Sequence, residues 1–177
     1  MAPDAAADRA FRPLHVAVLT VSDSRGPGDD ASGDVLAERV AGGGHVLAAR
    51  DWVADDLAAL TARLRALAQD PAVEVVITTG GTGVTGRDVT PEAVEAVCDK
   101  MIPGFGELFR WISFEIIGTA TIQSRATAGV AGGTYIFALP GSPSAVRDGW
   151  DRILAAQLDS RHRPCNFAEL LPRLGER

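Results

Sequence analysis

The run VEVVITT at residues 73–79 is rich in β-branched residues and leads directly into the glycine-rich stretch GGTGVTG at residues 80–86. A short, nearly continuous apolar run of this kind is typical of a strand that is buried on both faces. Such strands occur mainly in parallel sheets covered by helices, in which ligands bind at the carboxyl ends of the strands. The run therefore predicts an internal strand, with a candidate ligand-binding loop directly after it.

The remainder of the chain alternates predicted strands with predicted helices. Further strands are expected at residues 14–21, 46–53 and 135–139, and helices at residues 33–41, about 55–70, 90–100, 104–117 and 142–158. Strands that alternate with helices indicate a parallel sheet covered on both faces. The sequence therefore predicts an α/β fold, a three-layer α/β/α sandwich with a mainly parallel central sheet. One domain is expected over residues 14–177, after a flexible N-terminus at residues 1–13.

Two of the predicted helices begin at residues that suit helix capping. Ser32 is expected to cap the helix at residues 33–41, and Asp55 the helix that follows it. Both side chains can accept a hydrogen bond from an N–H group of the first helical turn. The triplet Gly42–Gly44 is expected to end the first of these helices.

The charge balance argues against a nucleic-acid partner. The 177 residues include 17 Lys+Arg and 23 Asp+Glu, which gives a net charge of −6 with His neutral. Proteins that bind nucleic acid through a broad basic face need the opposite balance. Lys100 is the only lysine, and it does not follow a glycine. The sequence therefore contains no GxxxxGK[ST] phosphate-binding loop.

Cysteine content and hydrophobic runs favour a cytoplasmic protein. Cys98 and Cys165 are too few for a disulfide framework and lack metal-ligand spacing with the three histidines. The first 13 residues contain no apolar signal-peptide core, and no apolar run approaches the roughly 18 residues of a membrane span. We therefore expect a cytoplasmic location and no membrane partner.

Three loops are expected at the carboxyl ends of strands, at residues 22–32, 80–90 and 139–144. The middle loop matches GxGxxG, the fingerprint of dinucleotide-binding folds. The match is weak, because the next helix begins only near Pro91 and no acidic strand end follows about 20 residues later. A different function suits the glycines better. Without Cβ atoms they let backbone N–H groups approach phosphate or carboxylate oxygens closely.

Arg87 and Asp88 follow this glycine-rich stretch directly. An Asp beside a bound phosphate is unfavourable unless a cation lies between them, and Mg²⁺ commonly bridges a carboxylate to nucleotide phosphates. Asp88 is therefore a candidate magnesium ligand. On the local pattern alone, Asp88 can equally be a turn or capping residue, and Arg87 a solvated surface charge.

Several motifs resemble those of one protein family. TGGTG at residues 79–83 and RDVTPEA at residues 87–93 resemble the signature of the MoaB/Mog family of molybdenum cofactor biosynthesis proteins. Further matching motifs, in the family order, are VSD at 21–23, DASG at 30–33, PGFGE at 103–107 and LPGS at 139–142. The resemblance covers residues 14–171. The segments that resemble the bacterial MoaB branch more than the Mog branch are residues 105–110, 117–119, 123–126 and 163–167.

The resemblance implies that the chain adenylylates molybdopterin. Active members of the family transfer AMP from Mg·ATP to the terminal phosphate of the pterin and release pyrophosphate, which activates the product for metal insertion by another protein. The reaction is an in-line attack of one phosphate on another, so catalysis would depend on positioning and charge stabilisation. Mg²⁺ with ATP is the implied cofactor, and molybdopterin is the implied substrate.

The resemblance also assigns roles to individual residues. Asp88 would be the main catalytic carboxylate and the metal ligand, and Asp55 the second functional Asp. Asp55 can instead be only a helix cap, and Asp56 can share its role. The nucleotide-phosphate cradle would be Gly80, Gly81, Thr82 and Gly83, and the other substrate- and nucleotide-binding positions would be Ser22, Asp23, Asp30, Ser32, Arg87, Pro140, Gly141 and Ser142.

For three of these residues the sequence leaves a structural role open. Asp23 and Asp30 can instead serve in turns, as Asp commonly does, and be solvated. Ser32 can be a helix cap, at a helix N-terminus that could nonetheless meet an anion.

The family forms trimers and, in the MoaB branch, hexamers, so the resemblance implies a homotrimer or homohexamer. The apolar helix at residues 105–117 and the tail at residues 167–171 are expected to supply the interface. Phe105, Phe109 and Trp111 are expected in the core or at subunit contacts and not as pterin stackers. A transient contact with a metal-insertion protein is a further implied partner.

Two other functions stay open from the sequence. One is a non-catalytic molybdopterin-binding or assembly protein of the MoaB branch, some members of which lack the Arg-Asp pair or the activity. The presence of Arg87, Asp88 and Asp55 favours the enzyme. The other is a hydrolase acting on a pyridine nucleotide, because such enzymes share this domain type.

Overall fold

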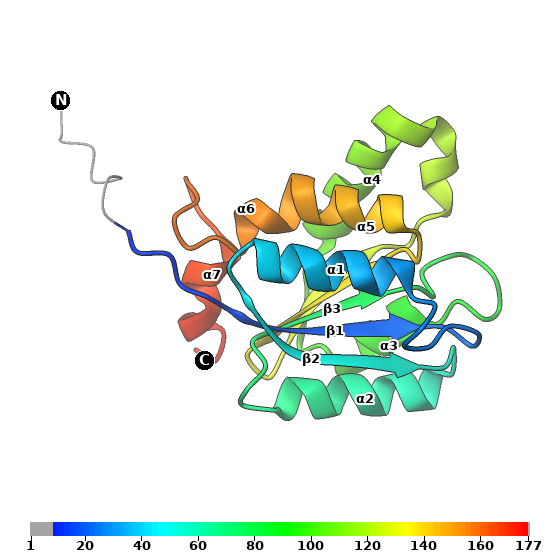
Figure 1. Ribbon diagram of the computed structural model, residues 1–177, viewed down its shortest axis with the longest axis horizontal. Coiled ribbons are helices and arrows are strands. Elements are labelled where there is room, and N and C mark those ends of the chain that lie inside the picture. The colour runs from blue at the N-terminus through cyan, green and yellow to red at the C-terminus, as the bar shows by residue number, and fades with distance from the viewer. Residues whose placement is uncertain (1–8, 177) are drawn as a thin grey trace.

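A six-stranded sheet forms the centre of the computed structural model, which describes residues 9–176 (Figure 1). The strands are β1 (His15–Val21), β2 (Val46–Val53), β3 (Val75–Thr79), β4 (Lys100–Met101), β5 (Thr127–Ala131) and β6 (Thr134–Leu139). The helices are α1 (Ala31–Gly42), α2 (Leu57–Gln69), α3 (Thr90–Val97), α4 (Pro103–Ile117), α5 (Pro143–Gly149), α6 (Ala155–Gln157) and α7 (Phe167–Leu170). Shorter helical turns are η1 (Gly118–Gln123), η2 (Trp150–Leu154) and η3 (Leu171–Arg173).

The sheet has the order β2-β1-β3-β6-β5-β4. The first four strands are parallel to one another, whereas β5 and β4 join antiparallel at one edge. The predicted α/β fold with a mainly parallel sheet is confirmed. The sequence prediction missed β4 and β5, because β4 has only two residues and β5 (TAGVA) has a glycine and small side chains. A turn at Gly132 and Gly133, both with positive φ, joins β5 to β6.

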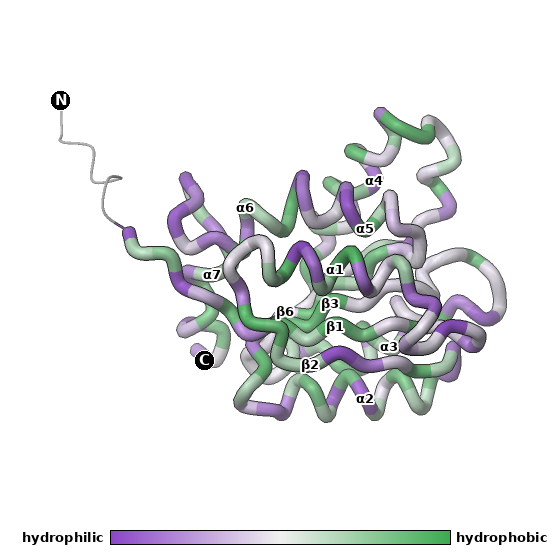
Figure 2. The backbone as a smooth tube through the Cα atoms, viewed as in Figure 1, coloured by the Kyte–Doolittle hydropathy of each residue, from purple (hydrophilic) through white to green (hydrophobic). Residues whose placement is uncertain are grey.

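Helices cover both faces of the sheet, as the predicted three-layer sandwich requires (Figure 1). In β1, Val16 and Val18 pack on the side of α1, α4 and α5, whereas Ala17 and Leu19 pack on the side of α2 and α3. This alternation follows from the two-residue period of a strand. The strands in the middle of Figure 2 are mainly hydrophobic for the same reason, since both of their faces are buried.

Four of the predicted helices differ from the structure, and one of them, expected at residues 90–100, ends at Val97 before β4. The cap of α1 is Asp30 and not Ser32, and the cap of α2 is Asp56 and not Asp55. In each case the residue that accepts the hydrogen bond from the first turn lies one or two positions from the predicted one. The helix expected at residues 142–158 is interrupted by the π-helical turn η2.

The described chain begins and ends at the side of the sheet opposite to the carboxyl ends of β1 and β3 (Figure 1). Of the segment 1–13 that the sequence predicts to be flexible, residues 1–8 lie outside the described part. Phe11 lies against His45, and the Arg12 backbone N–H donates to Ser160 Oγ over 2.9 Å. Among residues 9–176, no helix is both long and apolar enough to cross a membrane.

Candidate functional site

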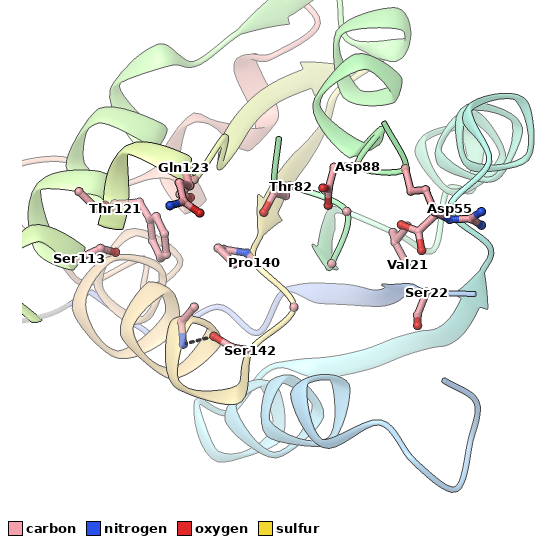
Figure 3. Close-up of a pocket in the computed structure, with 18 of the residues that line it drawn as sticks. Val21, Ser22, Asp55, Thr82, Asp88, Ser113, Thr121, Gln123, Pro140 and Ser142 are labelled. Carbon is pink, nitrogen blue, oxygen red and sulfur yellow. Dashed lines mark hydrogen bonds between the residues drawn. The ribbon is translucent and has the colours of Figure 1, made fainter. Parts of the chain in front are cut away.

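A pocket of about 500 Å³ lies at the carboxyl ends of the parallel strands (Figure 3). One side comes from the ends of β1 and β3 and from the loops before α2 and α3, and the other from α4, η1 and the start of α5. Ser22, Asp55 and Asp88 lie on the first side in Figure 3, opposite Ser113, Thr121 and Gln123. The pocket therefore lies where ligands bind in open parallel sheets.

Most of the predicted site residues meet in this pocket. Those that line it are Ser22, Asp55, Gly80, Gly81, Thr82, Gly83, Arg87, Asp88, Pro140, Gly141 and Ser142. They come from loops that are far apart in the sequence but follow neighbouring strands, because β1, β3 and β6 lie side by side in the sheet.

Gly80 and Gly81 form a tight turn at the end of β3. Their φ angles are +106° and +64°, which residues with a side chain rarely adopt. A Cβ atom on Gly80 would also collide with the carbonyl oxygen of Val21. The turn is closed by Thr90, whose N–H donates to Gly81 O over 3.0 Å and whose hydroxyl donates to Gly80 O over 2.9 Å. The glycines are therefore required by the backbone geometry at the pocket floor.

Asp55 and Asp23 hold the loops after β2 and β1 together. The N–H of Asp23 donates to Asp55 Oδ2 over 3.2 Å, and the N–H of Asp55 donates to Asp23 Oδ1 over 3.1 Å. Asp23 also forms an ion pair with Arg87. Asp23 does not line the pocket, so its observed role is to position Asp55 and Arg87, which do.

The Asp88 carboxylate is held by its own loop. Its Oδ2 accepts hydrogen bonds from Thr85 N over 2.9 Å and from Thr85 Oγ1 over 2.6 Å. Partial burial acts to raise the pKa of Asp88, but these hydrogen bonds, a further one from the Gly83 backbone and the nearby charge of Arg125 together hold the pKa below its ordinary value. The geometry therefore favours an ionised Asp88.

Asp55 shows the opposite shift. Burial raises the pKa of Asp55, and the negative charge of Asp88 raises it further. The two carboxylates are thus close enough to repel each other, and a cation between them would relieve that repulsion. Two oxygen-donor side chains suit Mg²⁺, which usually binds through one or two carboxylates together with substrate phosphates. Within residues 9–176 there is no cluster of three or more His, Cys, Asp or Glu that could hold a metal by itself.

Arg25 is a pocket residue that the sequence analysis missed. Its Nη1 donates to Gly141 O over 2.9 Å, and its backbone N–H donates to Ser22 Oγ over 3.2 Å. The guanidinium thus connects the loop after β1 to the loop after β6, and it brings a second positive charge to the pocket beside Arg87. The only signal in the sequence was the place of Arg25 within the predicted loop at residues 22–32, two positions after Asp23.

Ser142 begins the helix α5 at the pocket wall. Its hydroxyl oxygen accepts the N–H of Ala145 over 3.2 Å, which makes it the cap of α5 (Figure 3). The preceding Pro140 carbonyl accepts the Thr79 hydroxyl over 3.1 Å, which ties this loop to the end of β3. The turn Pro140–Gly141 is therefore fixed against the glycine turn.

Asp30 and Ser32 do not line this pocket, in contrast to the expectation from the resemblance. The Asp30 side chain accepts hydrogen bonds from Thr20 Oγ1 over 2.6 Å and from Trp52 Nε1 over 3.0 Å, and it pairs with Arg50. Ser32 Oγ donates to Asp30 Oδ1 over 3.3 Å. These contacts hold the pKa of Asp30 below its ordinary value although burial opposes that shift. Both residues therefore fix α1 to the sheet.

The wall formed by α4 and η1 was also missed. Its pocket-lining residues are Phe109, Ser113, Ile117, Ala120, Thr121, Gln123 and Ser124. Thr121 is fixed by a hydrogen bond from its hydroxyl to Arg110 O over 3.1 Å. Phe105 and Phe109 lie in the core as expected, whereas Trp111 is 66% exposed and lies on the outer side of the helix.

Comparison with known proteins identifies the family. The family described as probable molybdopterin binding domain matches residues 17–160. Molybdenum cofactor biosynthesis protein B of Escherichia coli K12 is 48% identical over 157 residues, which cover 89% of this chain and 92% of that protein. The corresponding protein of Bacillus subtilis 168 is 42% identical over 142 residues, which cover 80% and 84% of the two chains.

Solved structures agree with the sequence comparison. A crystal structure of molybdenum cofactor biosynthesis protein B has a TM-score of 0.86 at 36% identity and covers 96% of this chain and 100% of its own. The tungsten cofactor synthesizing protein MoaB from Pyrococcus furiosus has a TM-score of 0.69 at 36% identity, covering 82% and 93%. The chain therefore belongs to the MoaB/Mog family of molybdenum cofactor biosynthesis proteins.

Proposed function

We propose that this protein adenylylates molybdopterin in the pocket at the carboxyl ends of the strands. The observation that supports this most strongly is that Asp55 and Asp88 line the same pocket as the glycine turn, where the charge of Asp88 adds to the effect of burial in raising the pKa of Asp55. Arg25 and Arg87 line the same pocket. Two carboxylates with two guanidinium groups suit a reaction in which an anionic nucleotide and an anionic acceptor meet with a cation between them.

The proposed reaction forms one phosphorus–oxygen bond and breaks another. A terminal phosphate oxygen of molybdopterin attacks the α-phosphorus of ATP, and the bond to the bridging oxygen of the β-phosphate breaks. Pyrophosphate leaves with the electron pair of that bond, and AMP stays on the pterin phosphate. Arg25 and Arg87 would orient the phosphates and offset their charge, because guanidinium groups bind phosphate through two parallel hydrogen bonds.

Asp55 and Asp88 would hold Mg²⁺ together with oxygens of the nucleotide. When bound, Mg²⁺ would neutralise charge between the carboxylates and the phosphates and stabilise the leaving pyrophosphate. The hydrogen bonds from Thr85 keep Asp88 ionised, and the contact with Asp23 orients Asp55. The chain's own residues would therefore supply the oxygen ligands in a fixed orientation.

The proposal is tested by looking for the product of the reaction. Purified protein is incubated with molybdopterin and Mg·ATP, and the pterin is analysed by mass spectrometry for attached AMP. Formation of adenylylated molybdopterin together with pyrophosphate supports the proposal. Tight binding of molybdopterin without product would instead indicate a non-catalytic binding protein, and turnover of nicotinamide mononucleotide would indicate the hydrolase.

The proposal extends to assembly and to a partner. We propose a homotrimer or homohexamer that uses the apolar outer face of α4 and η1. The tail at residues 167–171, which was also expected at the interface, instead packs Phe167 and Ala168 into the core. An adenylylated product that awaits its metal also needs a second protein to receive it, so transient contact with a metal-insertion protein belongs to the same proposal. A cytoplasmic location would give access to ATP and to that partner.

A further inference from the structure

Arg125 makes four contacts with the loop that presents Asp88 and with the helix that follows it. Its Nε donates to Gly83 O and its Nη2 donates to Asp88 O, each over 2.6 Å. Its backbone N–H donates to Thr82 O over 2.9 Å, and its Nη1 forms an ion pair with Glu92 of α3. One side chain thus joins both ends of the segment 83–88 and the first turn of α3.

We propose that Arg125 is a positioning residue that fixes the Asp88 carboxylate at the pocket for the transfer reaction. This inference rests on the proposed function for its catalytic consequence. Arg125 does not line the pocket, so its action on any bound substrate passes through the loop it holds.

Besides Arg125, the ion pair of Arg87 with Asp23 ties this loop to the loop after β1. Val84, near its middle, is 66% exposed, and α3, which begins at Thr90, has no side-chain hydrogen bond from its cap residue Val89. The internal contacts of the loop are those between Thr85 and Asp88, with the Asp88 N–H donating to Thr85 O over 3.0 Å. These contacts shape the loop but do not attach it to the sheet. The attachment to the β5 side of the molecule comes from Arg125.

A lysine cannot replace this arrangement. The guanidinium group is planar and donates in several fixed directions at once, which suits two carbonyl oxygens and one carboxylate around it. A lysine ammonium is a single charge on a flexible stem and cannot reach all three acceptors in the same geometry. The variant R125K therefore retains the positive charge but loses the set of hydrogen bonds to the loop. It separates the effect of the charge from the effect of the hydrogen bonds.

The experiment combines a measurement on the loop with a measurement on the reaction. In R125K and R125Q, amide hydrogen exchange at Thr85 and Asp88 is expected to be faster by about tenfold, because the loop opens more often. In the transfer reaction kcat is expected to fall by about tenfold while KM for molybdopterin stays within about threefold, because the groups that bind the pterin are unchanged. R125K is the variant to use if R125Q does not fold.

Arg110 provides the matched control. Its Nη1 donates to Ala126 O over 3.0 Å, so it holds the same segment but touches neither Gly83 nor Asp88. R110Q is expected to leave both exchange rates and the kcat within about twofold of the wild-type values. Wild-type exchange in R125K would overturn the positioning role, and so would an R110Q variant that changes exchange as much as R125Q does. If the wild-type protein transfers no AMP, the proposed function fails, and the exchange rates still decide the role of Arg125.

Discussion

Asp55 and Asp88 are the same residue type in one pocket, yet their pKa values shift in opposite directions. The difference comes from their hydrogen bonds. Thr85 donates twice to Asp88, whereas Asp55 accepts one backbone N–H and experiences the charge of Asp88. Asp88 is therefore the stronger candidate for an ionised metal ligand, and a bound cation would offset the repulsion that raises the pKa of Asp55.

Loss of the Asp88 charge is expected to slow AMP transfer. D88N removes the charge that would hold Mg²⁺ and is expected to lower kcat for AMP transfer by about 100-fold, with a much smaller change in KM for molybdopterin. D151N is the control, because Asp151 makes a surface ion pair with Arg39 and does not line the pocket. Rates are measured at saturating Mg·ATP. A D88N enzyme with the wild-type rate would remove Asp88 from the mechanism.

Asp30 is predicted to affect stability. D30A removes a buried carboxylate that caps α1 and pairs with Arg50, so the free energy of unfolding is expected to fall by about 3 kcal/mol. Asp34 pairs with the same arginine but is exposed, so D34A is expected to cost less than about 1 kcal/mol. Urea unfolding at neutral pH compares the two variants. Equal losses in D30A and D34A would contradict the structural role of Asp30.

The stabilising contribution of Asp30 is expected to depend on pH, in the direction set by the shift of its pKa. The pKa of Asp30 is lower in the folded protein than its ordinary value of 3.8, so its stabilising contribution is full above that value and is lost as the pH falls through the folded pKa. The difference in unfolding free energy between wild type and D30A is therefore expected to shrink as the pH is lowered from about 5 to about 2. A difference that stays constant over this range would show that the charge of Asp30 is not stabilising.

At the scale of an element, the glycine turn after β3 is the most constrained part of the site. G80A would place a Cβ atom against Val21 O at a φ of +106°, so the variant is expected to lose about 2 kcal/mol of stability or to shift the turn. G86A is the control in the same loop, because a Cβ atom there meets nothing within 4 Å and its φ is not positive. Thermal unfolding compares the variants. Equal stability of G80A and G86A would show that the turn does not need its glycine.

The elements that the sequence predicted well are those whose patterns are local. The β-branched run before Gly80 and the leucine spacing of α2 appear within a few residues, and the structure contains both elements. In α2 the leucines Leu60, Leu64 and Leu67 are buried, whereas Leu57 is exposed at the first position of the helix. The strand β5 was missed because its small residues form a strand only through pairing with β6.

The same difference between local and non-local patterns explains which site residues could be predicted from the sequence. Gly80, Gly81 and Asp88 belong to one continuous motif, so their meeting in a pocket follows from the position of one strand end. Ser113 and Gln123 reach the pocket only because α4 and η1 fold over the sheet, which no local pattern encodes. The role of Asp30 could also not be predicted from a local pattern, because its hydrogen-bond partners Thr20 and Trp52 lie on the strands β1 and β2.

At the scale of the whole molecule, the outer face of α4 and η1 differs from the rest of the surface. Exposed apolar side chains gather there, and these are Leu108, Trp111, Phe114, Ile116, Ile117 and Ile122. In Figure 1 these elements extend away from the sheet, at the edge of the molecule. A concentration of exposed large apolar residues on neighbouring elements is typical of a protein interface. Because Ile117 also lines the pocket, assembly through this face would lie next to the site.

The oligomeric state can be tested by measuring the mass of the protein in solution. Light scattering of the wild-type protein is expected to give three or six times the monomer mass of 18.5 kDa. W111E places a charge in the middle of the apolar face and is expected to yield monomers, because an unpaired charge is strongly unfavourable in a buried interface. V84E is the control, since Val84 is as exposed as Trp111 but lies on the loop before Asp88. A wild-type mass near 18.5 kDa would contradict the oligomer, and loss of assembly in V84E alone would move the interface to that loop.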